Sequence, residues 1–99
     1  MTYSLHITKA AEEDVREAYL WYEGQKEGLG GIFEMHISEA LGSIMVNPLK
    51  IQIRYGAVRV FFLTKFPYGV HFYTYDHTIL ILAVFHTSRA TERWEERNQ

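Results

Sequence analysis

The sequence predicts one α+β domain over residues 1–99: an antiparallel β-sheet with two N-terminal helices packed on one face and a short C-terminal helix. Residues 57–86 show three consecutive strand patterns separated by turns, after a short edge-strand pattern at residues 51–55. Two amphipathic helical patterns come first, and Asn47-Pro48 ends the second. A chain of 99 residues, of which 47% are hydrophobic, suffices for one packed core.

Composition narrows the possible functions. The absence of cysteine excludes disulfides and Cys-based zinc sites. The histidines are scattered without a metal-ligand spacing, so we expect neither a metal nor a cofactor. The N-terminus lacks the apolar core of a signal peptide, and the longest apolar run, residues 79–85, is too short to span a bilayer. We therefore expect a soluble, cytoplasmic protein without a membrane partner.

Charge is distributed unevenly, although the net charge is only −2. Residues 1–39 are rich in Asp and Glu. Residues 40–75 contain neither, and their cations are Lys50, Arg54, Arg59 and Lys65. This pattern predicts that an anionic partner would meet the middle of the chain. The alternative is that the helix surfaces simply carry the carboxylates.

The N-terminal part predicts a short strand and two helices. Residues 3–7 alternate apolar and polar side chains, and Thr8 is placed to cap the helix that follows. The apolar stripe of this helix consists of Ala11, Val15, Ala18 and Tyr22. After a joint with Gly24 and Gly28, a second helix covers about residues 29–46. Its stripe is Leu29, Phe33, Ile37, Leu41 and Ile44, with Ala40 beside it. Helices joined this way form an antiparallel pair, and the sheet is available to bury both stripes.

Turn positions predict the register of the three longer strands. A hairpin centred on Phe66 places Arg59 opposite Tyr73. A two-residue turn at Asp76-His77 places Tyr73 opposite Leu80. Both statements describe directly opposed backbone positions, so coordinates test them at once.

Alternation along the strands then divides the sheet into two faces. The almost entirely apolar face is expected to meet the helices; it carries Val58, Val60, Phe62, Val70, Phe72, Thr74, Ile79, Ile81, Ala83 and Phe85. The opposite face mixes cations, tyrosines and aliphatic side chains; it carries Arg59, Phe61, Leu63, His71, Tyr73, Tyr75, Leu80, Leu82, Val84 and His86.

After His86 the sequence predicts a short helix. Arg89, Arg93 and Arg97 recur at four-residue spacing and share one side of it. Trp94 is expected to act as a packing anchor that folds back onto the strand before the tail, at Leu80, Leu82 and Val84.

A set of short motifs in a fixed order resembles one known family. It comprises a Glu-Glu-Asp helix start, Trp21-Tyr22-Glu23, Gly28-Leu29-Gly30, Asn47-Pro48, Val58-Arg59, Phe66-Pro67-Tyr68 and the ending His86-x-x-Arg89-x-x-x-x-Trp94-x-x-Arg97. Together these resemble the ParE/RelE toxin superfamily, also called plasmid-stabilisation proteins, over nearly the whole chain. The Phe-Pro-Tyr hairpin and the His-x-x-Arg ending are more similar to the ParE branch than to the RelE branch.

The resemblance implies a RelE/ParE-like fold and the toxin component of a type II toxin–antitoxin module, neutralised by a cognate antitoxin protein. ParE-like members poison DNA gyrase by binding it, without covalent chemistry of their own. RelE-like members are endoribonucleases that cleave mRNA on the ribosome. A third alternative is a non-toxic relative that only binds its antitoxin.

A nuclease would require its catalytic side chains to lie close together. Arg59, Tyr73 and His86 would supply the phosphate contact and the proton transfers, so they must converge on one phosphate. The sequence departs from the nuclease pattern, because Tyr68-Gly69 stands where many nucleases of the family place an arginine. It also lacks the strong positive charge suited to a ribosomal RNA surface. The resemblance therefore favours the gyrase inhibitor.

The residues expected at a target or partner contact are Arg59, Phe66, Tyr68, His71, Tyr73, His86 and Arg89. Each of the main candidates has a structural alternative. Arg59 instead stacks on Tyr73 or pairs with a glutamate of the tail, and His86 instead hydrogen-bonds the tail and sets its direction. The Phe66–Tyr68 segment is either an exposed aromatic contact at a hairpin tip or a turn locked by proline.

Overall fold

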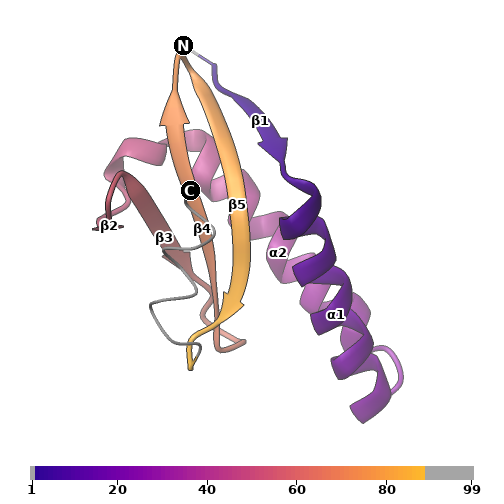
Figure 1. Cartoon of the computed structure of the whole chain (residues 1–99). Coiled ribbons are helices and arrows are strands. Elements are labelled where there is room, and N and C mark those ends of the chain that lie inside the picture. Colours follow the sequence, from indigo (N-terminus) through magenta and orange to yellow (C-terminus); the bar gives the residue numbers. More distant parts are fainter. Residues whose placement is uncertain (1, 89–99) are drawn as a thin grey trace.

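The structure is a computed structural model, and it describes residues 2–88. Its elements are β1 (Ser4–Ile7), α1 (Lys9–Gln25), α2 (Leu29–Val46), the 3₁₀ helix η1 (Pro48–Lys50), β2 (Ile53–Tyr55), β3 (Val58–Phe62), β4 (Tyr68–Tyr75) and β5 (Thr78–His86). The strands form one sheet in the order β1-β5-β4-β3-β2, with β2 at an edge as predicted (Figure 1). The predicted C-terminal helix, with Arg89, Arg93, Trp94 and Arg97, lies outside the described residues.

Both N-terminal helices lie on one face of the sheet, which we call the helix face (Figure 1). The main core forms there, between the predicted stripes of α1 and α2 and the side chains of β4 and β5. Its buried members are Ala11, Ala18, Phe33, Ile37, Ala40, Ile44, Phe66, Val70, Phe72, Ile79, Ile81 and Val84. The prediction of an α+β fold with two helices on one face is therefore confirmed.

Side-chain caps fix both helix starts. Thr8 is the N-cap of α1, and its Oγ1 accepts a hydrogen bond from the backbone N–H of Ala11 at 3.1 Å, as predicted. The start of α2 has no side-chain cap of its own at Gly28. Instead the carboxylate of Glu23 accepts hydrogen bonds from the N–H groups of Gly28 and Gly30, each at 2.9 Å. An anion at the positive end of α2 thus holds the joint between the two helices.

The sheet is mixed rather than wholly antiparallel, which corrects the prediction. β1 pairs with β5 in parallel, from Ser4 opposite Thr78 to Ile7 opposite Ile81. The other pairs are antiparallel. A parallel pair needs a long connection between its strands, and here the whole segment from α1 to β4 provides it. The first strand therefore closes one edge of the sheet next to the last strand.

The register of β4 and β5 is confirmed, with Tyr73 opposite Leu80. Asp76 and His77 both have positive φ, 45° and 60°, as a two-residue hairpin turn of this kind requires. The register of β3 and β4 was predicted wrongly by one residue, because Arg59 lies opposite Phe72 and not Tyr73.

This error has a local cause and a large consequence. The N–H of Leu63 donates to the carbonyl of Tyr68 at 2.9 Å, so the loop spans residues 64–67 and is not centred on Phe66. A slip of one residue turns every side chain of a strand to the other face. Phe61 and Leu63 accordingly pack against the helix-face core, while Val58 joins a second cluster on the far face. The predicted faces of β3 are therefore exchanged.

At the end of β5, a bulge likewise turns side chains to the face opposite to the predicted one. The ladder between β4 and β5 shifts between His71 and Phe72, with two residues of β5, Leu82 and Ala83, on the far face. Beyond the bulge Val84 packs on the helix face and Phe85 on the far face, the reverse of the prediction. The far-face cluster consists of Val58, Leu82, Ala83 and Phe85, with Tyr55, Tyr73 and Leu80 packed against it.

Candidate functional site

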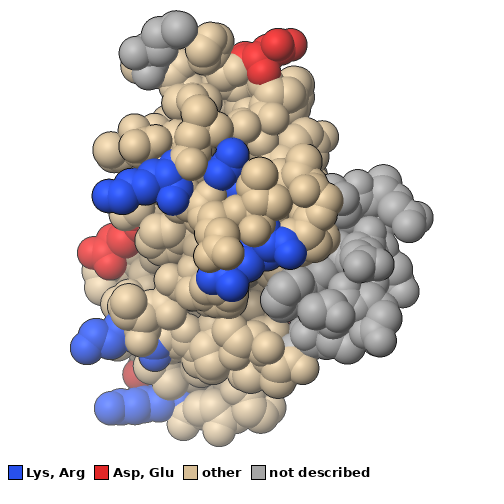
Figure 2. Space-filling model, turned by 90° about the vertical axis from the view of Figure 1, so that its left-hand side faces the viewer, with Lys and Arg blue, Asp and Glu red and all other residues tan. Residues whose placement is uncertain are grey.

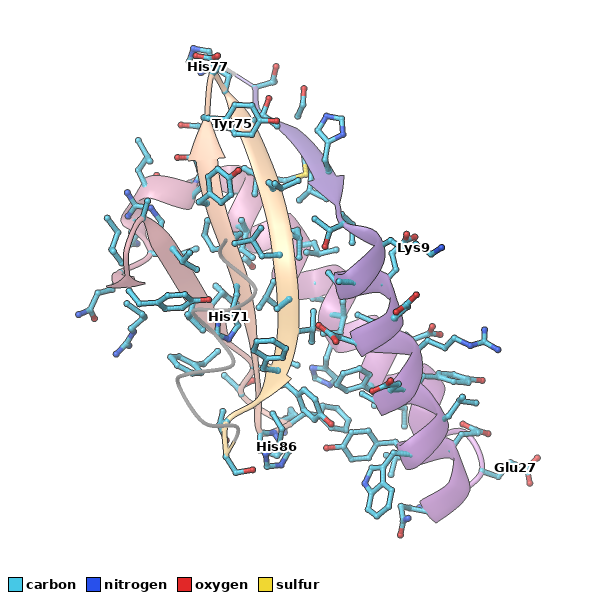
Figure 3. The ribbon with its side chains drawn as sticks, viewed as in Figure 1. Lys9, Glu27, His71, Tyr75, His77 and His86 are labelled. Atoms are coloured by element: carbon cyan, nitrogen blue, oxygen red, sulfur yellow. The ribbon has the colours of Figure 1, made fainter. Side chains whose placement is uncertain are left out.

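His71 lies in the middle of the far face and is only 1% exposed (Figure 3). Its Nδ1 and the hydroxyl of Tyr55 are 3.0 Å apart, which ties β4 to the edge strand β2. Its ring meets the ring of Phe85 edge to face at 5.1 Å. In this structure His71 packs and hydrogen-bonds within the sheet, and its expected role at a target or partner contact stays a prediction.

Two tyrosines at the end of β4 are more accessible. Tyr73 is half-buried and Tyr75 is exposed, and their rings lie 5.8 Å apart. Tyr75 lies at the same end of the hairpin as His77 (Figure 3). This end of the sheet presents aromatic area with polar tips, a composition that favours protein contacts.

His86 lies at the opposite end of the hairpin (Figure 3), directly across the ladder from Tyr68. The two rings meet edge to face at 5.2 Å. The Nδ1 of His86 accepts a hydrogen bond from the N–H of Ser88 at 3.1 Å and lies 2.8 Å from its hydroxyl. Because a backbone N–H can only donate, Nδ1 is an acceptor here. His86 thus holds the turn after β5, as the structural alternative predicted.

Arg59 does not face the tyrosines of the far face. Its Nη1 donates to the carbonyl of Leu49 at 3.1 Å and to the carbonyl of Ile51 at 2.6 Å. Charge-assisted bonds to two carbonyls fasten the segment after α2 onto β3. Stacking on Tyr73 was therefore the wrong structural alternative, and the other, a pair with a tail glutamate, involves residues outside the described range. Arg59 joins the segment after α2 to β3.

The three candidate nuclease residues do not converge. Tyr73 belongs to the far face, whereas Arg59 bonds the segment that follows α2. Tyr73 is opposite Leu80. Along β5 the distance from Leu80 to His86 is about 20 Å at the usual rise per residue of a strand. No single phosphate reaches all three side chains. Arg89, the remaining candidate, lies outside the described residues.

The hairpin tip between β3 and β4 points into the core. Phe66 is 8% exposed and meets the rings of Tyr22, Phe33 and His36 at 4.9, 5.2 and 5.3 Å. The expectation that Phe66 is an exposed contact is therefore wrong, and Tyr68 is half-buried in the same ring cluster. Burial raises the pKa of the Tyr22 hydroxyl.

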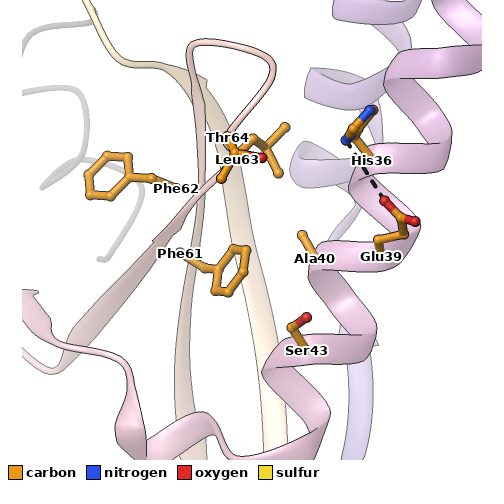
Figure 4. A pocket seen from close by; sticks show the side chains of 8 residues that line it. All are labelled: His36, Glu39, Ala40, Ser43, Phe61, Phe62, Leu63 and Thr64. Atoms are coloured by element: carbon orange, nitrogen blue, oxygen red, sulfur yellow. Dashed lines mark ion pairs between the residues drawn. The ribbon is translucent and has the colours of Figure 1, made fainter.

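A groove runs between α2 and β3, and sequence reasoning did not predict it. Its first part, of about 140 Å³, is lined by His36, Glu39, Ala40, Ser43, Phe61, Phe62, Leu63 and Thr64. In Figure 4 Phe61 points from β3 toward α2, and Phe62 points to the other side of the sheet. A larger hollow of about 590 Å³ adjoins it through Ser43 and Phe61, and Val46, Asn47, Lys50 and Ile51 complete its lining.

The described residues place limits on other kinds of site. No group of three His, Cys, Asp or Glu side chains that could hold a metal ion occurs within residues 2–88. No helix in that range combines the length and the apolar character needed to cross a membrane.

Comparison of the fold with solved structures finds close geometric matches. A chain in the structure of the chromosomal ParDE TA system from P. aeruginosa superposes with a TM-score of 0.77 at 19% identity, over 85% of this chain and 95% of that one. The chain has the RelE/ParE-like fold. A chain of the toxin–antitoxin complex RelBE2 from Mycobacterium tuberculosis matches with a TM-score of 0.60 at 18% identity, over 87% of this chain and 99% of that one. No protein-family model and no curated protein matches the chain in sequence.

These matches confirm the fold that the resemblance implied. Of the two, the chain from the ParDE system has the higher TM-score. Identity below 20% limits both likenesses to the fold, because one fold serves different targets.

Proposed function

We propose that this chain is the toxin of a type II toxin–antitoxin pair, that it acts in the cytoplasm by binding DNA gyrase, and that a cognate antitoxin neutralises it. The observation that carries the proposal is the fold likeness to a chain of the ParDE system, which extends over most of both chains. The sequence motifs point to the same branch.

Two properties of the chain favour a binding inhibitor over a nuclease. Arg59, Tyr73 and His86 are held apart, and two of them are occupied by structural hydrogen bonds. The net charge of −2 is also unlike that of a protein that works against a phosphate-rich surface. A gyrase-binding protein needs neither a convergent catalytic group nor a strong positive field.

The accessible aromatic end of the sheet is the best place for a target contact. Tyr73 keeps its role as a contact residue, with Tyr75 beside it. Tyr68 and His86, at the opposite end of the sheet, form a second contact region. Arg89 stays a contact residue predicted from the sequence. Phe66, His71 and Arg59 act by shaping the surface.

A ribosome-dependent endoribonuclease is the second candidate, and its support is the likeness to a chain of the RelBE2 complex. For that activity, residues other than the three named above would have to form the catalytic group. A non-toxic, antitoxin-binding relative is the third.

Controlled expression of the chain alone in a bacterium tests the proposal, with DNA synthesis, protein synthesis and mRNA integrity followed in parallel. We expect DNA synthesis to fall first and the SOS response to follow, while mRNA stays intact. Tyr73→Ser should weaken this effect, whereas Met35→Ser, an exposed control on α2, should not. Early mRNA cleavage would identify the nuclease instead, and normal growth at good expression would identify the non-toxic relative.

A further inference from the structure

The helix α2 is apolar on its outer side as well as on its inner side. The inner stripe enters the core of the helix face. The outer side also exposes large apolar side chains, namely Ile32, Met35, Met45 and Val46. The helix contains no Lys or Arg. A helix that covers a sheet usually turns charged and polar side chains to water, so this outer face has the composition of an interface.

The charged surfaces of the molecule lie elsewhere. On the side where β2 and β3 lie, Lys and Arg predominate over Asp and Glu (Figure 2). The helix α1 exposes both signs of charge, for example at Lys9, Glu13 and Arg16. A nucleic acid or a strongly charged protein would be attracted to these surfaces. The outer face of α2 instead suits an apolar partner.

Two glycines of this face have no explanation within the chain. Gly31 and Gly42 lie inside α2, where glycine is less favourable than alanine. A Cβ on either would meet nothing within 4 Å, whereas a Cβ on Gly30 would lie 2.8 Å from the carbonyl oxygen of Tyr19. Neither Gly31 nor Gly42 has a positive φ. A surface without side chains at these two positions lets a second helix approach closely.

The order of large and small residues along this face is self-complementary. Met35 and Gly42 are both exposed and lie about 10 Å apart along the helix. When two copies of α2 cross in antiparallel orientation just after Ser38, Met35 of each copy lies opposite Gly42 of the other. By the same symmetry Val46, which is 85% exposed, lies opposite Gly31. Large apolar side chains therefore meet glycines.

We infer that the outer face of α2 binds the same face of a second copy of this chain, in an antiparallel pair with two-fold symmetry. The second copy supplies the matching pattern by symmetry. The positive end of each α2 then lies beside the negative end of the other, so the helix dipoles are complementary. Glu39, next to the crossing point, lies near its own copy across the two-fold axis and weakens the pair.

The inference goes beyond the proposed function and does not depend on it. The face of α2 and Tyr73 lie on opposite sides of the sheet. Pairing through α2 therefore leaves the proposed target contact at Tyr73 accessible, and a change on α2 tests the pair alone.

The size of the face predicts a weak dimer. α2 has 18 residues, so the contact is at most about 27 Å long and roughly 10 Å wide. This is less than the area of about 800 Å² that each partner contributes to a standard interface. We therefore expect monomers and dimers to exchange, with a Kd on the order of 100 μM.

Sedimentation velocity of the full chain from about 10 μM to 1 mM measures the association. Gly42→Leu should weaken it at least about tenfold, because the added side chain occupies the place of Met35 from the second copy. The same substitution should raise the melting temperature of the dilute chain, because leucine favours a helix. Loss of folding cannot produce this pair of results.

Two further variants control the measurement. Gly24 is an exposed glycine of α1, and a Cβ there would also meet nothing within 4 Å. Gly24→Leu should therefore leave the association unchanged. Glu39→Gln should tighten the dimer about twofold, because it removes the repulsion between the two carboxylates.

Introduced thiols test the register, since the chain has no cysteine of its own. Met35→Cys mixed with Gly42→Cys should form a disulfide-linked dimer on mild oxidation. Each variant alone should form it much more slowly, because its two thiols would lie about 10 Å apart along the helix axis, beyond the reach of a disulfide.

Three results would overturn the inference. The first is a chain that stays monomeric up to about 1 mM, and the second is a dimer that Gly42→Leu leaves intact. The third is a monomeric chain whose binding to its antitoxin is weakened by Gly42→Leu, which would assign the face to the antitoxin. None of these results contradicts the proposed toxin activity.

Discussion

The carboxylate of Asp14 in α1 accepts a hydrogen bond from the backbone N–H of Val84 in β5, at 3.0 Å. β1 accompanies β5 only as far as Ile81. Past that point the N–H of Thr8 donates to the carbonyl of Ile81 at 3.1 Å. Further along β5, Asp14 accepts from the N–H of Val84. The helix thus covers a strand edge that would otherwise be free to pair with another chain.

Asp14→Ala should lower the free energy of unfolding by about 1.5–3 kcal/mol, because it leaves the N–H of Val84 without its charged acceptor. Urea denaturation measures the change. Glu13→Ala, an exposed neighbour, should stay within about 0.5 kcal/mol of the wild type. Equal stability of the two variants would show that the bond to Val84 carries no net stabilisation.

Two adjacent glycines of α2 predict opposite effects of the same substitution. A Cβ at Gly30 would lie 2.8 Å from the carbonyl oxygen of Tyr19, whereas a Cβ at Gly31 would meet nothing within 4 Å. Gly30→Ala should therefore destabilise by about 1–3 kcal/mol, and Gly31→Ala should stabilise by about 0.5–1 kcal/mol. Thermal melting of both variants checks this, and shifts of the same sign would contradict the close packing of α1 on α2.

Arg59→Met should lower the free energy of unfolding by about 1–3 kcal/mol, because it removes the bonds to the carbonyls of Leu49 and Ile51. Hydrogen exchange should rise over residues 48–55. Arg54→Met is the matched control, since Arg54 only lies over the ring of Phe62 at 5.2 Å, a contact of about 0.5–1 kcal/mol. Unchanged hydrogen exchange in Arg59→Met would show that these bonds do not hold residues 48–55 in place. Arg59 would then be available for a partner contact.

Because the hydroxyl of Tyr22 is buried, we expect the free energy of unfolding to fall in alkaline solution. Burial raises its pKa in the folded state, so above about pH 10 the unfolded chain gives up the hydroxyl proton first. The contribution is fully present below that pH and is lost as the pH rises toward the folded-state pKa. Urea midpoints between pH 8 and 11 should fall less steeply for Tyr22→Phe than for the wild type. Parallel curves would mean that the ring cluster leaves this hydroxyl well solvated.

The sequence predicted the helices well because each carries its own signals. Thr8 as a cap, the stripes of α1 and α2 and the Asn47-Pro48 stop are local features, and all agree with the structure. The hairpin of β4 and β5 was also predictable, since a two-residue turn at Asp76-His77 allows one register.

The faces of β3 and of the end of β5 were not predictable in the same way. Both faces of these strands are apolar, so a shift of one residue leaves a pattern that still looks consistent. The four-residue loop before Tyr68 and the bulge at Leu82 and Ala83 each introduce such a shift. The candidate site was misjudged as a result, because Arg59 and Tyr73 were placed on one surface.

Other features of the site depend on tertiary contacts that no local pattern encodes. The burial of Phe66 under Tyr22 and Phe33 needs both helices in place. The groove between α2 and β3 had one sequence signal, the acid-free stretch of residues 40–75, and its exposed apolar rim at Val46 and Leu49 had none.

The most direct test of the proposed function is a supercoiling assay with purified DNA gyrase and the full chain. We expect the chain alone to inhibit supercoiling and added antitoxin to restore it, while mRNA in a translation extract stays intact. Uninhibited gyrase at a large excess of folded chain, together with cleaved mRNA in the extract, would contradict it.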